Sequence, residues 1–453
     1  MRKLKGGWAI IVKVLSFALI AFQLYTTGRG PYSDIIQRGV HLSFVLTLLF
    51  LLKPARKLKE GEVQDFVPWY DVVLAGLSCA TCVYLVSISG RILYDPLQWL
   101  SWFDKAASVI LVILILEASR RSVGWTFPIL GIAFLIYAFY GEMFPGVWGH
   151  QNFTFNMVFQ NFYHSTRGIW GTMLGLSATM LSMFGIFGAI LSGTGGAETF
   201  IKMGQRFTGR FTGGSGKVSV VASSLFGMIS GSAIGNVVAT GVFTIPSMKK
   251  AGYTNEWAAT VEAVSSTGGQ IMPPIMGAAA FLMAEYIGIP YAKVAVKAIL
   301  PAILYFTGIF ISVHLEAKKL GLRGIPRDQL PKWGLLARDC YLILPLILLV
   351  WLVSSGAKTM SHSAAYSILA AIAVGLVNFF LTRMRDAEEK SAKTAVRAVG
   401  GALADSGKSA VDSLEAGAKG AITVAVACAM AGIIAGCITV TGLASILINA
   451  VVQ

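Results

Sequence analysis

The chain has 453 residues, of which 55% are hydrophobic and only 13% are charged, and its mean hydropathy is +0.69. A soluble domain carries about 25% charged residues, so this composition excludes an ordinary soluble fold. The net charge of +15 does not indicate nucleic-acid binding, because the basic residues form short clusters between apolar segments. We therefore predict an all-α polytopic membrane protein.

Apolar segments close to the ~20 residues needed to cross a bilayer recur along the whole chain. The basic start, Met1–Lys5, is followed by further spans and by no small-residue cleavage site, so we expect a retained first helix. About eleven transmembrane helices are expected, at Trp8–Thr27, Val40–Leu52, Trp69–Gly90, Lys105–Ser119, Trp125–Tyr140, Gly168–Ser192, Trp257–Tyr286, Val294–His314, Tyr341–Ser354, Ser363–Thr382 and Ala421–Val440.

Basic clusters alternate between the two ends of these spans. Clusters such as Lys53–Lys59 and Arg120-Arg121 mark loops on the cytoplasmic side, and the N-terminus is then also cytoplasmic. The alternation holds only if Lys217–Lys249 enters and leaves on the same side. We therefore expect residues 215–250 to form a re-entrant helical hairpin that turns at Ser230–Asn236, beside protein or a water-filled cavity.

The next apolar segment, residues 256–286, is interrupted by Gly268–Pro274. Proline removes a hydrogen-bond donor and paired glycines free the backbone, so we expect a helix broken near the bilayer midplane. A hairpin followed by a broken helix indicates an ion and substrate site in secondary transporters.

Sodium is a hard ion that prefers oxygen ligands, and the hairpin tip and the break are rich in them. Glycines there let backbone approach an ion closely. The candidate ion and substrate residues are Ser230, Gly231, Ser232, Gly235 and Asn236 at the tip, and Ser265, Ser266, Thr267, Gly268, Gly269, Gln270, Pro273 and Pro274 at the break. We expect Ser230, Ser232, Asn236 and Thr267 to hold sodium. The alternative for each serine or glycine is ordinary packing between membrane helices.

Glu262 is an acid inside an expected span, and intramembrane acids are expensive. It is a possible coupling acid, and it could equally carry a proton, bind an ion or form a structural pair.

The alternatives to a secondary transporter are an intramembrane enzyme and a channel. An enzyme needs a base beside its nucleophile, and neither histidine nor lysine lies near the serine cluster in sequence. A channel lines a continuous pore, whereas a hairpin and a broken helix favour an occluded site. No Walker A sequence is present. We expect a non-enzyme without a cofactor, with sodium as its coupling ion.

Paired elements in such transporters come from inverted repeats. The segment Gly168–Ser192 with Glu198–Phe211 weakly resembles Ala421–Val440 with Ala444–Gln453, but no second hairpin follows. We expect an inverted-repeat transporter whose second repeat is incomplete here, and we favour truncation over supply of the rest by another chain.

Three stretches carry a family resemblance: Ser223–Asn236, Thr244–Tyr253 and Glu262–Gly277. They resemble the first hairpin and the following break of the large permease subunits of tripartite ATP-independent periplasmic (TRAP) transporters. Leu116–Arg121 and Leu300–Tyr305 resemble permeases in which the small and large subunits are fused. The resemblance covers residues 65–325 well, although Gly235 stands where the family commonly has alanine.

This resemblance implies sodium-coupled uptake of a small organic acid anion into a bacterium across its inner membrane by an elevator motion. The implied partner is a periplasmic substrate-binding protein of the TAXI type, and the permease unit is expected to be monomeric. The expected domains are small-subunit-like helices at 1–122, a connection at 123–167, the first repeat at 168–330, connecting helices with a cytoplasmic amphipathic segment at 331–418, and the start of a second repeat at 419–453.

Overall fold

The computed structural model describes residues 1–2, 4–56, 62, 64–95, 100–386 and 392–452, and the regular elements of these ranges are all helices. Lys57 and Lys59 of the first basic cluster, residues 387–391 of the expected amphipathic segment, and Gln453 lie outside the described residues. Eight helical segments among the described residues are long and apolar enough to cross a membrane, which supports a polytopic membrane protein.

These eight segments coincide with eight of the expected spans. The other three expected spans do not coincide with segments that are both long and apolar enough to cross a membrane. Lys105–Ser119 lies in α5 (Trp102–Ser122), which has charged residues in its first and last turns. Trp125–Tyr140 lies in the short helix α6 (Thr126–Phe139). Trp257–Tyr286 is divided between α13 (Asn255–Gly268) and α14 (Ala278–Ile287). The total number of spans remains a prediction.

The chain divides into two compact units, the first of which contains residues 1–182 and 418–453. Its central helix is α2 (Asp34–Leu52), which packs against its neighbours and buries Leu42, Val45, Leu46 and Leu48–Leu52. The other elements are α1 (Gly7–Arg29), α3 (Trp69–Ser87), α4 (Ser89–Tyr94), α5, α6, η1 (Gly141–Met143), η2 (Gly146–Trp148), α7 (Phe155–Tyr163), α8 (Thr172–Leu176), η3 (Ser177–Leu181), the end of α19 (Ala392–Thr441) and α20 (Leu443–Val452).

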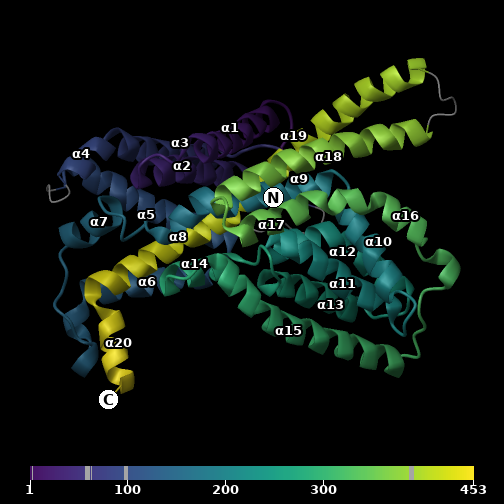
Figure 1. The fold of residues 1–453 in the computed structure, drawn as a ribbon. Helices are drawn as coiled ribbons and strands as arrows, with labels where there is room; N and C mark the ends of the chain where they lie inside the picture. The colour runs from purple at the N-terminus through teal and green to yellow at the C-terminus, as the bar shows by residue number, and fades with distance from the viewer. Residues whose placement is uncertain (3, 57–61, 63, 96–99, 387–391, 453) are drawn as a thin grey trace. The chain divides into compact units, whose positions relative to one another are not determined.

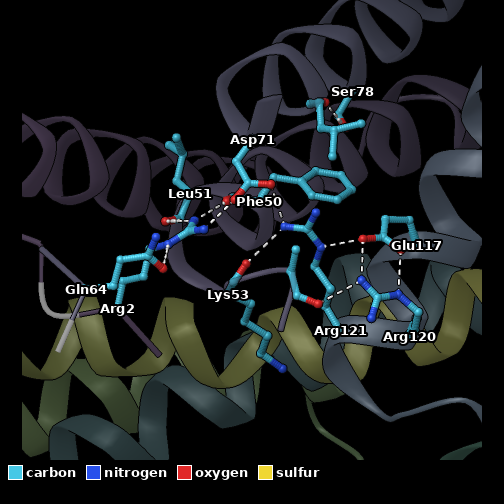
Figure 2. A network of polar contacts seen from close by, with 12 residues as sticks. Arg2, Phe50, Leu51, Lys53, Gln64, Asp71, Ser78, Glu117, Arg120 and Arg121 are labelled. Atoms are coloured by element: carbon cyan, nitrogen blue, oxygen red, sulfur yellow. Dashed lines mark hydrogen bonds and ion pairs between the residues drawn. The ribbon is translucent and has the colours of Figure 1, made fainter. Parts of the chain in front are cut away.

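An ion-pair network, buried around Asp71 and partly exposed at Glu117 and Arg120, joins three segments of the first unit (Figure 2). Asp71, at the start of α3, pairs with Arg2 and, at 2.7 Å, with Arg121 at the end of α5. Arg121 and Arg120 both pair with Glu117 at 2.7 Å. Arg2 also donates to the carbonyls of Phe50 and Leu51, and Arg121 to that of Lys53. The N-terminus, the end of α2 and the end of α5 therefore lie close together. This agrees with the basic clusters, which predict that all three are on the same side of the membrane.

The second unit contains residues 183–417. Its elements are α9 (Ser182–Gly193), α10 (Gly196–Thr208), α11 (Gly214–Ser230), α12 (Ala233–Lys250), α13, η4 (Gly269–Ile271), α14, α15 (Tyr291–Lys319), η5 (Arg327–Gln329), α16 (Trp333–Asp339), η6 (Cys340–Ile343), α17 (Leu344–Ser355), α18 (Met360–Asp386) and the first part of α19. Figure 1 shows α11, α12 and α13 side by side.

The long helix α19 crosses one of the expected domain boundaries. The cytoplasmic amphipathic segment expected to end at residue 418 and the expected span Ala421–Val440 lie on either side of this boundary. In the structure a single helix of 50 residues, Ala392–Thr441, contains both, and it continues through Gly417 and Gly420, with no proline to end it.

The hairpin α11–α12 rests on a small apolar core at its base. Val220 of α11, Met248 of α12, Val261 of α13 and Val313 of α15 are all buried there. The hydroxyl of Thr254 accepts a hydrogen bond from the Trp257 amide and so starts α13 directly after the hairpin ends. The base of the hairpin and the start of the broken helix are therefore fixed together.

Candidate functional site

The hairpin predicted from sequence is formed by α11, a turn at Gly231-Ser232, and α12. Gly231 ends α11 with a φ of 56°, a left-handed conformation that favours glycine. Ser232 starts α12, because its hydroxyl accepts a hydrogen bond from the Gly235 amide at 3.2 Å. Two short sequence signals therefore place the tip where it was expected.

The break in the next helix lies directly against this tip. Helix α13 ends at Gly268, η4 continues to Ile271, and an irregular stretch leads to α14 at Ala278. The Ile275 amide donates to the Met228 carbonyl of α11 at 3.2 Å. A Cβ placed on Gly231 would collide with the Met276 carbonyl, so only glycine permits this contact. The structure thus brings the two predicted irregularities together.

Two glycines let the ends of α11 and α13 touch through their backbones. A Cβ on Gly269 would lie 2.6 Å from Cα of Gly227 and 3.2 Å from Nδ2 of Asn236. Real Cβ atoms do not come that close to backbone, so both positions require glycine. The last turn of α11 and the start of η4 therefore meet beside the Asn236 amide, whose Nδ2 lies at the contact.

Glu262 lies in α13, before the break, and is fully buried. Five hydroxyls donate to its carboxylate. Oε2 accepts from Thr244 at 2.6 Å and from Ser219 at 2.7 Å. Oε1 accepts from Thr240 at 2.5 Å, Ser223 at 3.1 Å and Ser266 at 3.2 Å. We call these five residues and Glu262 the hydroxyl cage.

The hydroxyl cage joins three helices without a positive charge. Ser219 and Ser223 come from α11, Thr240 and Thr244 from α12, and Ser266 from α13, which also carries Glu262. No salt bridge to Glu262 occurs in the described ranges. The five hydroxyls are therefore structural partners of Glu262, one of the roles that the sequence leaves open for it. A coupling role for Glu262 remains a prediction.

Sequence reasoning missed four of the cage residues: Ser219, Ser223, Thr240 and Thr244. A signal was present, because Ser219/Ser223, Thr240/Thr244 and Glu262/Ser266 are each spaced i,i+4 and so lie on one face of their helix. Three polar faces of this kind in successive membrane helices have to meet one another. The opposite face of α12, with Ile234, Val238 and Val242, is exposed and apolar, as expected for a helix in an apolar environment.

The predicted tip residues occupy different environments. Asn236 is fully buried, and its Nδ2 donates to the Ser223 carbonyl at 2.7 Å. Ser230 and Ser232 are partly buried, and Gly235 is exposed. The Ser230 hydroxyl lies 3.4 Å from both the amide and the carbonyl of Ser232. Asn236 is therefore the tip side chain that reaches the interior.

The predicted break residues divide in the same way. Ser265 and Ser266 are fully buried and Gly268 and Gly269 are buried, and the Ser265 hydroxyl has no hydrogen-bond partner among the described residues. Thr267 and Gln270 are exposed, and the Thr267 hydroxyl donates to the Ala263 carbonyl at 2.8 Å. Pro273 and Pro274 are partly buried, and the Pro274 carbonyl accepts from Tyr291 at 2.9 Å.

A shallow recess of about 280 Å³ beside α11 is lined mainly by apolar side chains, including Val220, Met272, Phe306 and Phe310. Such a lining suits lipid tails better than an organic anion, so we do not assign a substrate to it. The described residues contain no group of three or more histidine, cysteine or acidic side chains that could hold a metal ion.

The site can therefore offer oxygen atoms to a weakly held cation. Oδ1 of Asn236 and the Ser230 carbonyl at the end of α11 are oxygen atoms without a formal charge, whereas the carbonyls of Gly227, Met228, Gly269 and Gln270 already accept backbone hydrogen bonds. This donor set suits a hard monovalent ion.

Comparison with known proteins gives the family. Residues 110–453 match the family model described as the DctM component of tripartite ATP-independent periplasmic transporters. A C4-dicarboxylate TRAP transporter large permease protein of Pseudomonas aeruginosa is 26% identical over 204 residues, which are 45% of this chain and 47% of that protein.

Two sialic acid TRAP permeases are also similar. The Haemophilus influenzae protein is 29% identical over 41% of this chain and 31% of its own length, and the Vibrio cholerae large permease is 25% identical over 43% and 45%. The chain thus spans less than half the length of each of these three relatives. All three are named as transport proteins rather than enzymes, in agreement with the expected non-enzyme. The chain belongs to the DctM family of TRAP transporter large permeases.

Proposed function

We propose that the chain is the permease component of a TRAP transporter that takes up a small organic acid anion with sodium. The observation that carries this proposal is the meeting of the hairpin tip with the helix break, where Gly227 and Gly269 bring two helix ends together beside the buried Asn236. Helix ends and neutral oxygens at such a junction favour a small cation without holding it irreversibly.

The proposed sodium ligands are those expected from sequence: Ser230, Ser232, Asn236 and Thr267. The structure supports Asn236 most strongly, because its side chain is fully buried at the junction. It supports the Thr267 hydroxyl least, since that side chain is exposed and bonded to its own helix. Sodium would supply the positive charge that draws an anion to the N-terminal end of α12.

The substrate class is supported by what the relatives are named for. One is named for C4-dicarboxylates, two for sialic acid, and one from Escherichia coli for 2,3-diketo-L-gulonate. We extend to this chain only the feature that these substrates share, which is a small organic acid anion.

Delivery and location complete the proposal. A periplasmic TAXI-type binding protein delivers the anion to a monomeric permease in the bacterial inner membrane. The N-terminus is cytoplasmic, residues 1–122 act as the small-subunit part, and the hairpin unit moves as an elevator. The convergence of Arg2, the end of α2 and Arg121 supports this orientation, because positive side chains gather on the cytoplasmic side.

Uptake in proteoliposomes tests the proposal. The complete permease that contains this chain is reconstituted, and its binding protein is supplied with a labelled organic acid anion. We expect uptake to require an inward sodium gradient and to collapse when choline replaces sodium. Equal uptake without sodium would refute sodium coupling, and uptake without the binding protein would refute the tripartite arrangement.

A further inference from the structure

Within the hydroxyl cage, the Thr240 hydroxyl lies near more hydrogen-bond acceptors than it has protons to donate. A threonine hydroxyl has a single proton to donate. Four acceptors lie within reach of the Thr240 hydroxyl: Oε1 of Glu262 at 2.5 Å, the carbonyl of Asn236 at 3.0 Å, Oδ1 of Asn236 at 3.2 Å and the Ser223 hydroxyl, also at 3.2 Å. Only one of them can receive the proton at a time.

The distances decide which acceptor receives it. Hydroxyl bonds to a carboxylate are about 2.5–2.7 Å long and roughly twice as strong as bonds to neutral oxygens. The 2.5 Å contact between Thr240 and Glu262 falls in that range, and both contacts to Asn236 are longer. The Thr240 proton therefore belongs to Glu262.

This choice leaves Oδ1 of Asn236 without a donor. The orientation of the Asn236 amide is fixed by its Nδ2, which donates to the Ser223 carbonyl at 2.7 Å. Among the described residues the only hydrogen bond to Oδ1 is the long one from Thr240. Asn236 is fully buried, so water does not readily replace that donor. A buried amide oxygen without a donor is costly, and a cation removes the cost.

We infer that Glu262 is a positioning residue for Asn236: by taking the Thr240 proton, it keeps Oδ1 of Asn236 open as a ligand for the cation. The inference rests on the proposed function, in which that cation is sodium. Glu262 does not touch the ion in this arrangement; it sets the direction of the hydrogen bonds that surround the ligand. The same carboxylate also holds Ser223, whose carbonyl orients the Asn236 amide.

The test replaces Glu262 with methionine, which keeps an unbranched side chain but removes both acceptor oxygens. The Thr240 proton then becomes available to Asn236, and we expect the sodium concentration for half-maximal uptake to rise about fivefold, the factor that corresponds to one hydrogen bond of ~1 kcal/mol. Sodium-dependent thermal stabilisation of the purified complete permease should shift to higher sodium by the same factor.

The decisive variant is the rescue. Thr240→Val removes the competing proton, so Glu262→Met/Thr240→Val should return the half-maximal sodium concentration to within about twofold of the parent. Thr240→Val alone should change it by less than about twofold. A merely structural role for Glu262 predicts the reverse, because the double variant has lost more of the cage.

Glu256→Gln is the matched control, since Glu256 is an exposed acid in the first turn of the same helix. If Glu262→Met does not accumulate in the membrane, Glu262→Gln replaces it, with a smaller shift in the same direction expected. An unchanged sodium dependence in the Glu262 variant, or a double variant worse than the single one, overturns the inference alone. Sodium-independent uptake by the parent protein overturns both the inference and the proposed function.

Discussion

At the scale of single residues, similar side chains separate according to the face on which they lie. Ser265 and Ser266 are buried, whereas the neighbouring Thr267 is exposed, although all three are hydroxyl residues beside the break. Sequence reasoning grouped them because it sees spacing along the chain. Rotation of about 100° per residue around α13 decides which of them reaches the hairpin.

Asn236 is the residue on which the proposed ion site depends most. Asn236→Ala removes both the candidate oxygen ligand and the bond to the Ser223 carbonyl. Loss of a buried polar contact of ~1–3 kcal/mol predicts uptake lowered about tenfold or more at limiting sodium, with the protein still present in the membrane. Sodium-dependent uptake and membrane content measure the two effects.

The matched control is Asn255→Ala, an exposed asparagine at the start of α13, for which we expect parental uptake. Ser232→Ala should also reduce uptake, because it removes the cap of α12 at the tip. Parental uptake by both Asn236→Ala and Ser232→Ala would place the site elsewhere in the protein.

At the scale of elements, the hairpin and the broken helix act as one packed group. Gly227 and Gly269 allow the backbones of α11 and η4 to touch near the hairpin tip. The hydroxyl cage links α11, α12 and α13 nearer the base of the hairpin. Sequence predicted each irregularity separately from its glycine and proline signals. It could not predict the contact between them, because nothing in a linear pattern records which glycine faces which.

Gly227→Ala tests this packing. The added methyl group would meet the Gly269 backbone, so α11 and η4 must separate. Overpacking of this kind costs about 1–3 kcal/mol, and we expect a lower midpoint in thermal unfolding of the detergent-solubilised protein.

Gly308→Ala in α15 provides the comparison, because a methyl group there meets nothing within 4 Å. That substitution should leave the midpoint unchanged or slightly raised, since alanine favours helices more than glycine does. The same loss of stability in both variants would show that Gly227 and Gly269 are not in tight contact.

At the scale of the whole molecule, each of the two units has its own means of holding its helices together. The first unit uses the ion-pair network of Arg2, Asp71, Glu117, Arg120 and Arg121, which is buried around Asp71, and the second uses the uncharged donors around Glu262. Sequence places Asp71 and Glu117 near the ends of expected spans, where either pairing with Arg120 or Arg121 or plain solvation is open, and the structure shows pairing. It did not predict that Arg2 would return to join them, because that contact bridges 69 positions along the chain.

Asp71→Asn should destabilise the first unit strongly. Asp71 is fully buried, and its loss leaves the guanidinium groups of Arg2 and Arg121 without their shared carboxylate. Breaking a buried pair from one side costs about 3–5 kcal/mol, so a large drop in thermal midpoint or in folded yield is expected.

Asp34→Asn gives the contrasting case, because the Asp34 side chain is 64% exposed in its pair with Arg38. Exposed pairs contribute about 0–1 kcal/mol, so its thermal midpoint should stay close to that of the parent. Comparable losses in the two variants would mean that the network in Figure 2 contributes no more than a surface pair.

Sequence by itself determined the membrane class, the hairpin tip within residues 230–236 and the break at residues 268–274, because apolar length, basic clusters, glycine and proline act locally along the chain. Only the tertiary structure decided that these two irregularities touch and that Glu262 receives five hydroxyl donors from three helices. The physical reason is that hydrogen bonds between helices depend on helix rotation and packing, which single-chain patterns leave open.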